Sequence, residues 1–151
     1  VFITPIDWKR VFIMQITRQA DYALRAMLYL ARLEENKRAA TSQIAEEMQI
    51  PPSFLAKIIS QLSIAGLIHT SRGARGGVSL AKKPDKISLL DVVEAIDGPI
   101  SLNECVQDPT ICSFGDNCPL HEVWCEAKAD LVQKLRASTF DKLLEREKQA
   151  A

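Results

Sequence analysis

Hydrophobic residues in the first half of the chain repeat at the spacing of amphipathic helices. From Thr17, whose side chain can cap a helix, to about Arg32, they recur three and four positions apart, so one face is apolar. A shorter helix is predicted near residues 41–48, with Thr41 or Ser42 as its cap. A third helix is predicted over residues 54–65.

The connection between the second and third predicted helices indicates how the two are arranged. It contains Pro51 and Pro52, and a residue that precedes a proline avoids helical geometry. Ser53 can cap the helix that follows, and Gly66 can end it. Two short helices joined by a tight turn are typical of a helix-turn-helix, although amphipathic helix pairs are common in other folds.

Two short strand-like segments follow, over residues 67–71 and 78–80. The glycine-rich, basic segment between them predicts a hairpin with a basic tip. A hairpin in this position is a wing, and Arg72 and Arg75 at its tip could contact a phosphate or enter a minor groove. The alternative is an ordinary solvated hairpin. A nucleotide-binding loop is excluded, because the Gly-Lys-Ser/Thr ending is missing.

The second half of the chain predicts further helices. Ser88 can cap one that runs to Asp97, residues 101–118 read as a loop, a long helix runs from Pro119 to about Ser138, and residues 140–148 form a short charged helix. The apolar stripe of the long helix consists of Val123, Trp124, Ala127, Leu131 and Leu135. The expected fold is therefore mainly α with a small β-hairpin: a winged helix-turn-helix followed by a long C-terminal helix.

Charge divides the chain although its net charge is zero. Residues 14–88 carry eleven basic and six acidic residues, whereas residues 89–151 carry six basic and twelve acidic residues. A basic first half indicates a surface for a polyanion, most often nucleic acid, with chance as the alternative. Polar side chains at the third predicted helix would then read base edges in a major groove. They are Ser53, Lys57, Ser60 and Gln61.

The sequence argues against several other classes of protein. No apolar run approaches the roughly eighteen residues of a membrane span. Residues 1–13 are apolar but interrupted by charges and lack a cleavage site, so we expect an N-terminal extension, a natural start at Met14 and a cytoplasmic protein. An enzyme is not expected, because no paired-carboxylate site, nucleophile elbow or phosphate loop has a suitable context.

The cysteines are the main candidates for chemistry, since in a reducing compartment they indicate metal ligands or redox centres before disulfides. Cys105, Cys112 and Cys118 lie within fourteen residues, and His121 follows. Three thiolates and an imidazole can hold a soft metal or a cluster. The close cysteine pairs of zinc sites are missing. The spacing favours an iron–sulfur cluster, with zinc, a thiol redox switch and no ligand role as alternatives. Cys125 is expected to be a small buried hydrophobe.

Several motifs taken together resemble a known family. They are Asp21-Tyr22-Ala23-Leu24-Arg25, Ile50-Pro51-Pro52-Ser53-Phe54-Leu55, Ala65-Gly66-Leu67, residues 71–77, residues 87–93, and the cysteine segment that closes with Cys118-Pro-Leu-His121-Glu-Val-Trp124. From Met14 to about Leu144 the chain resembles the winged-helix iron–sulfur transcription regulators that include IscR, NsrR, RirA and CymR. The IscR-like members are the most similar.

The resemblance implies a homodimer that reads a palindromic operator in double-stranded DNA. Residues 14–98 would form the winged helix-turn-helix DNA-binding domain, and residues 99–118 the cysteine-containing ligand loop. Residues 119–151 would form the dimerisation helix, which crosses its partner, and a tail. Residues 1–13 have no counterpart in the family. Ala56 stands where the recognition helix of the family often carries a glutamate.

The resemblance also implies cluster ligands. Cys105, Cys112 and Cys118 match the three cysteines of cluster-binding members, although the first gap is one residue longer than in the IscR-like pattern. The fourth ligand is a histidine on a 2Fe–2S cluster in the IscR-like branch, which matches His121. In the NsrR-like branch it is an acidic residue of the partner subunit on a 4Fe–4S cluster, which matches Asp21. The 2Fe–2S cluster is the first expectation.

The predicted function is a sequence-specific DNA-binding transcription regulator controlled by an iron–sulfur cluster that senses iron, redox state or nitric oxide. One alternative is a cluster-free winged-helix regulator that senses a metabolite or a partner protein. Another is an iron–sulfur carrier protein, which would leave the basic first half unexplained.

Overall fold

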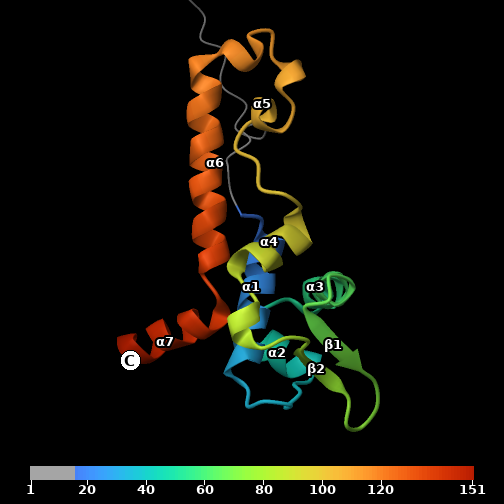
Figure 1. The fold of residues 1–151 in the computed structure, drawn as a ribbon. Coiled ribbons are helices and arrows are strands. Elements are labelled where there is room, and N and C mark those ends of the chain that lie inside the picture. The colour runs from blue at the N-terminus through green and yellow to red at the C-terminus, as the bar shows by residue number, and fades with distance from the viewer. Residues whose placement is uncertain (1–15) are drawn as a thin grey trace, which may run out of the picture.

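Helix α1 lies at the centre of the computed structural model, which describes residues 16–151 (Figure 1). The predicted extension over residues 1–13 and the start at Met14 lie outside the described residues. The helices and strands are α1 (Arg18–Arg32), α2 (Thr41–Glu47), α3 (Pro52–Ile64), β1 (Ile68–Ser71), β2 (Gly77–Leu80), α4 (Leu89–Asp97), α5 (Glu104–Gln107), α6 (Pro119–Ala137) and α7 (Phe140–Ala150), with short 3-10 turns at Pro84–Lys86, Pro109–Ile111 and Gly115–Asn117.

The core forms where α2, α3, α4 and α7 pack against α1. The inner face of α1 carries alanines at positions 20, 23 and 26, which are fully buried and leave room for the neighbouring helices. Met27 of α1, Ile44 of α2 and Ile58 of α3 fill the centre and are also fully buried. The predicted cap of α1 is confirmed, because the side chain of Thr17 accepts a hydrogen bond from the backbone N–H of Ala20 at 3.1 Å.

Two other predicted caps are wrong. Helix α2 begins after Ala40 without a side-chain cap, because Ala39 is held by two backbone hydrogen bonds to Val78 and the chain turns directly after it. Helix α3 begins at Pro52, and Pro51 occupies the cap position in place of Ser53. Proline suits the first turn of a helix, where its fixed backbone angle is already helical and its missing N–H has no partner to lose.

Strands β1 and β2 form the predicted hairpin, with Ile68 opposite Leu80 and Ser71 opposite Gly77. The segment before α2 joins this hairpin through a bridge between Ala39 and Val78. Gly77 is required at this junction: its φ is +139°, and a Cβ there would lie 2.7 Å from the carbonyl oxygen of Ala39. The segment before α2 is therefore attached to β2 at the end that follows the hairpin tip.

Ser88 caps α4 as predicted and forms a capping box with Asp91. Its hydroxyl accepts from the backbone N–H of Asp91 at 3.2 Å, and the Asp91 carboxylate accepts from the backbone N–H of Ser88 at 2.8 Å.

Replacing Ser88, which is 5% exposed, with alanine is expected to lower the free energy of unfolding by about 1 kcal/mol. Urea denaturation measures this loss. The matched change at exposed Ser60 should stay within about 0.5 kcal/mol, and equal effects would contradict the cap.

The cysteine segment differs from the predicted loop over residues 101–118. It contains α5, which carries Cys105, and two 3-10 turns. Asp108 caps the first turn, since its side chain accepts from the backbone N–H of Thr110 at 3.0 Å, and Pro109 begins that turn. Elements of three or four residues are too short to show hydrophobic periodicity, which is why the sequence did not reveal them.

Helix α6 projects away from the winged body, with α5 and the cysteine segment at its far end (Figure 1). It has no fully buried residue within the described chain. Val123 and Trp124 of its predicted stripe are 58% and 41% exposed. None of the helices in residues 16–151 is long and apolar enough to cross a membrane.

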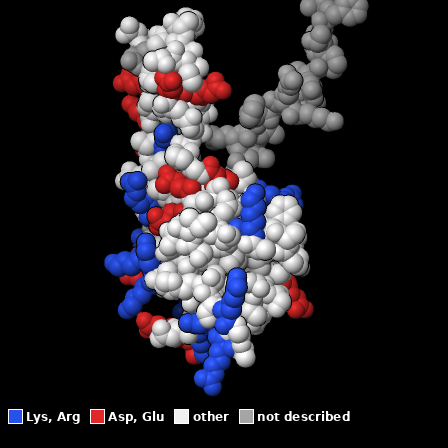
Figure 2. Space-filling model, turned by 90° about the vertical axis from the view of Figure 1, so that its right-hand side faces the viewer, with Lys and Arg blue, Asp and Glu red and all other residues white. Residues whose placement is uncertain are grey.

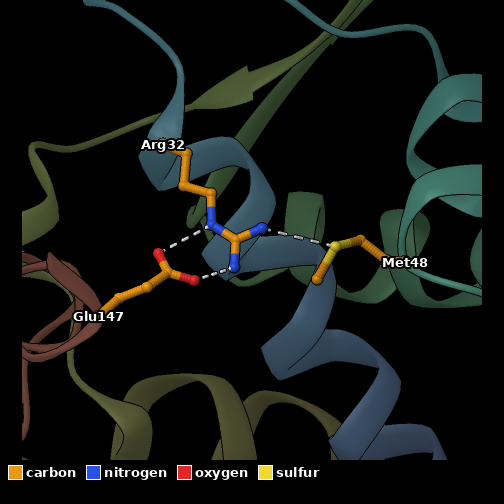
Figure 3. Close-up of polar contacts among 3 residues, drawn as sticks. All are labelled: Arg32, Met48 and Glu147. Atoms are coloured by element: carbon orange, nitrogen blue, oxygen red, sulfur yellow. Dashed lines mark hydrogen bonds and ion pairs between the residues drawn. The ribbon is translucent and has the colours of Figure 1, made fainter. Parts of the chain in front are cut away.

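Helix α7 returns to the body and holds the base of α6 in place. Phe140 is 1% exposed within the core, and the guanidinium of Arg32 on α1 forms an ion pair with both carboxylate oxygens of Glu147 (Figure 3). The same guanidinium contacts the sulfur of Met48, at the end of α2 (Figure 3). Because this ion pair is exposed, burial of Phe140 is the stronger attachment of the two.

Candidate functional site

The outer face of α3 presents the polar side chains predicted from the sequence. Ser53, Lys57 and Ser60 are exposed, whereas Gln61 is half-buried. The side-chain oxygen of Gln61 accepts a hydrogen bond from the side-chain nitrogen of Gln19 on α1 at 2.6 Å. Gln61 therefore also joins α3 to α1, a contact that the spacing of polar residues in α3 does not indicate.

An aromatic cluster beside the start of α3 was missed by the sequence analysis. Phe54 is 46% exposed and packs edge-on against Tyr22, with ring centroids 5.9 Å apart. The guanidinium of Arg25 lies 5.6 Å from the Tyr22 ring and is ion-paired at 2.8 Å with Asp21. All four residues occur in the motifs that carried the family resemblance. The family resemblance was the only sequence signal for this cluster, because hydrophobic periodicity by itself assigns an aromatic residue to the core.

The tip of the hairpin carries Arg72 and Arg75, and both side chains are exposed. Neither forms an ion pair with any residue that the structure describes. Arg38, by contrast, donates a hydrogen bond to the hydroxyl of Ser71 at the end of β1. Arg38 thus supports the end of β1 next to the tip, while the two tip arginines are available to a ligand.

Basic side chains are concentrated on the lower part of the molecule. Figure 2 shows Lys and Arg extending down to the end that carries the hairpin tip, while many of the Asp and Glu side chains gather higher up, toward α6 and the cysteine segment. This separation matches the split between a basic first half and an acidic second half of the sequence. A polar helix face beside a basic hairpin suits a nucleic-acid duplex, with the helix in a groove and the hairpin along the phosphates.

The three cysteines of the segment between α4 and α6 are free and half-buried. Cys105 is on α5, Cys112 follows the first 3-10 turn, and Cys118 directly precedes α6. Across residues 16–151, no three His, Cys, Asp or Glu side chains come together closely enough to hold a metal ion. The structure places the predicted ligands in one segment but does not bring their donor atoms together.

His121 is in the first turn of α6, and its ring makes a specific contact. Its Nε2 lies 3.4 Å from Sγ of Cys125, and its Nδ1 is buried without a hydrogen-bond partner in the described part of the chain. Its backbone N–H donates to the carbonyl of Cys118 at 3.0 Å. Cys125 is half-buried, so the expectation of a buried hydrophobe is wrong: α6 projects from the body, and one side of the cysteine faces His121.

Two acidic residues complete the description of the candidate ligands. Asp21, the predicted alternative ligand from a partner subunit, is half-buried and ion-paired with Arg25 within its own chain. Asp108 lies in the cysteine segment, where the hydroxyl and backbone N–H of Thr110 lower the pKa of its carboxyl group. Asp108 is therefore ionised at neutral pH, but its carboxylate already accepts these two hydrogen bonds.

The donor set fits an iron–sulfur cluster in its chemistry. Thiolates are the usual ligands of such clusters, and a histidine can replace a cysteine. The unpartnered Nδ1 of His121 is the structural observation that favours a ligand, since buried polar atoms rarely lack a partner. To bind one cluster, Cys105, Cys112 and Cys118 would have to converge beside the start of α6.

Comparisons with known proteins agree with this combination of elements. The family model Rrf2, described as an iron-dependent transcriptional regulator, matches residues 16–146. The HTH-type transcriptional regulator NsrR of Shouchella clausii (strain KSM-K16) is 36% identical over 132 residues, which cover 87% of this chain and 89% of that protein.

Two solved structures share the fold. The structure of CymR, the global cysteine regulator of B. subtilis, aligns with a TM-score of 0.74 and 26% identity, covering 89% of this chain and 98% of that one. IscR of T. potens aligns with a TM-score of 0.73 and 24% identity over 90% of each chain, which supports the fold alone.

Proposed function

The chain belongs to the Rrf2 family of transcriptional regulators, and from this premise we propose that an iron–sulfur cluster held by its cysteine segment controls how tightly it binds operator DNA. Its relatives are transcriptional regulators, and it is a winged-helix DNA-binding protein of that kind. The family's description as iron-dependent supports the cluster, as does the buried, unpartnered Nδ1 of His121. Such a regulator would act in the cytoplasm.

The DNA contacts follow from the exposed side chains of α3 and the hairpin. Four side chains at α3 would face the bases of the major groove, where polar side chains discriminate base pairs: Ser53, Lys57, Ser60 and Gln61. Arg72 and Arg75 would contact phosphates or enter the minor groove. Affinity should fall steeply with salt, because each neutralised phosphate releases counterions.

A homodimer is supported by the surface of α6. Leu120, Val123 and Trp124 are 66%, 58% and 41% exposed on a helix that extends away from the rest of the chain (Figure 1). Covering these residues with the same helix of a second copy would remove apolar surface from water. Two copies would then present two recognition helices and two wings to a palindromic site.

Cys105, Cys112, Cys118 and His121 would hold the cluster, with Asp21 of the partner subunit as the alternative to the histidine. A bound 2Fe–2S cluster, or a 4Fe–4S cluster in the alternative, would supply an iron centre that responds to redox state, iron supply or nitric oxide. The protein's own contribution would be a change in the arrangement of its elements. Ligation would draw α5 and the two following turns onto the start of α6. The base of α6 is joined to α4, since the backbone N–H of Leu89 donates to the carbonyl of Ser138 at 2.9 Å.

The test compares iron-loaded and iron-free protein on one operator. Protein purified without oxygen should be coloured and contain iron and inorganic sulfide. Its affinity for a duplex selected from random sequences should change about 5–150-fold after chelation, which corresponds to a coupling free energy of about 1–3 kcal/mol. Both forms are titrated at one salt concentration, since affinity depends on salt. Equal affinity of the two forms would contradict cluster control.

A cluster-free regulator is the second candidate, because no three candidate ligands converge in residues 16–151. In that case the protein would sense a metabolite or a partner protein. Colourless protein without iron or sulfide, still able to bind its selected operator, would favour this candidate.

A further inference from the structure

We propose that Cys125 is a positioning residue for the cluster: its sulfur accepts a hydrogen bond from Nε2–H of His121, which leaves Nδ1 of the same ring free to bind iron. This inference rests on the function proposed above. It assigns a role to the one cysteine that lies outside the predicted ligand set.

The contact follows from the position of the two residues on α6. They are four positions apart, so their side chains share one face of the helix. Nε2 of His121 lies 3.4 Å from Sγ of Cys125, a hydrogen-bonding distance for sulfur. The thiol and the ring are both half-buried, so water does not fully replace this contact.

The tautomer of the His121 ring decides which atom donates in this hydrogen bond. A neutral imidazole carries a proton on one nitrogen and a lone pair on the other. Nδ1 of His121 is buried and has no partner among the described residues. With the proton on Nε2, the sulfur of Cys125 accepts a hydrogen bond from Nε2–H, and Nδ1 offers the lone pair that a metal requires. The opposite tautomer would place an N–H on Nδ1, which cannot bind a metal, so a ligand role for Nδ1 requires the proton on Nε2.

The ring also lies where ligand-bearing segments meet. Helix α5, which carries Cys105, packs against α6, and the backbone N–H of His121 donates to the carbonyl of Cys118 at 3.0 Å. Metal-binding histidines almost always donate their other ring N–H to a neighbouring acceptor, which fixes the ring orientation and the tautomer. A sulfur atom is a weak acceptor, but it is the one that the structure places beside Nε2.

The tautomer is measured first, in the reduced, iron-free, full-length protein. The chain has two histidines, so long-range ¹H–¹⁵N NMR spectra resolve His121 against the exposed His69 as an internal reference. At a fixed pH at which the ring is neutral, we expect the proton of His121 on Nε2 and none on Nδ1. A proton on Nδ1 would overturn the proposal.

Cluster retention is measured next, on the iron-loaded protein. Cys125→Ala is expected to weaken retention against a chelator about tenfold, the lower end of the effect seen when such neighbouring partners are removed. Cys125→Ser should recover part of the loss, because a hydroxyl oxygen can accept the same hydrogen bond. The matched control is Ala129→Ser, an exposed position one turn further along α6, which should behave as wild type.

The outcomes separate this proposal from the one it rests on. Wild-type protein without iron or sulfide would overturn both. A wild-type cluster that Cys125→Ala retains equally well would overturn the positioning role alone. A cluster lost entirely in Cys125→Ala but kept in His121→Ala would make Cys125 itself the ligand, which also contradicts the proposal.

Discussion

Replacing Arg72 and Arg75 together with alanine is expected to weaken binding to the selected operator by about 100-fold or more. Each such contact contributes about 1–3 kcal/mol when it reads a base edge, and phosphate contacts add an electrostatic component that depends on salt. The two side chains are exposed at the hairpin tip and form no ion pair with residues 16–151, so their loss disturbs little within the protein. Fluorescence anisotropy at several salt concentrations measures the effect.

The salt dependence identifies what the arginines contact. If both bind phosphates, the slope of log affinity against log salt should decrease by about two, and specific and non-specific duplexes should lose affinity equally. If one enters a minor groove, the loss should be larger for sites in which that groove is narrow. The matched control is Arg146→Ala with Lys148→Ala, which removes the same charge from α7 and leaves the hairpin tip unchanged. An equal loss in both double variants would contradict the wing contact.

The helical body was predictable because its helices have a regular apolar period. The apolar stripe of α1 packs into the observed core, as do Leu55, Ile58, Ile59 and Leu62 of α3, whereas Ala65, also expected to point inward, is exposed. The cap at Ser88 was also predictable, because it needs only Asp91 three residues later. The start of α2 was not, because it is set by the bridge between Ala39 and Val78, and a pairing across such a distance in sequence leaves no local pattern.

The candidate site was predictable in its residue types rather than in its geometry. Exposed arginines at a glycine-rich tip and cysteines in one segment follow from the sequence alone. The contact between His121 and Cys125 was missed because Cys125 was expected to be a small buried hydrophobe, whereas it is half-buried and lies beside the His121 ring. The apolar stripe of α6 shows the same limit of prediction from sequence. Periodicity indicates which residues share a face, but it does not say whether the covering surface belongs to the same chain.

Replacing Cys112 with alanine is expected to abolish iron and sulfide binding. Its thiol lies between those of Cys105 and Cys118 in the segment, and without it two cysteines and one histidine remain in the proposed ligand set. A cluster needs its full set of thiolate or imidazole ligands, so the loss should be complete rather than graded. The measurements are the visible absorbance and the iron and sulfide content of protein purified without oxygen.

Stability measurements show whether such a loss is chemical or structural. Cys112 is half-buried outside the core, so the iron-free variant should unfold at the same urea concentration as iron-free wild type. The control is Ser113→Ala, at the adjacent exposed position, which should keep the full absorbance. A normal spectrum in Cys112→Ala would remove that residue from the ligand set, and an equal loss in Ser113→Ala would indicate distortion of the segment. Because α2, α3, α4, α7 and β2 pack against α1 whereas α5 packs against α6, the Cys112 variant should still bind non-specific duplex DNA. It would then differ from wild type only in the part of the operator affinity that depends on the cluster.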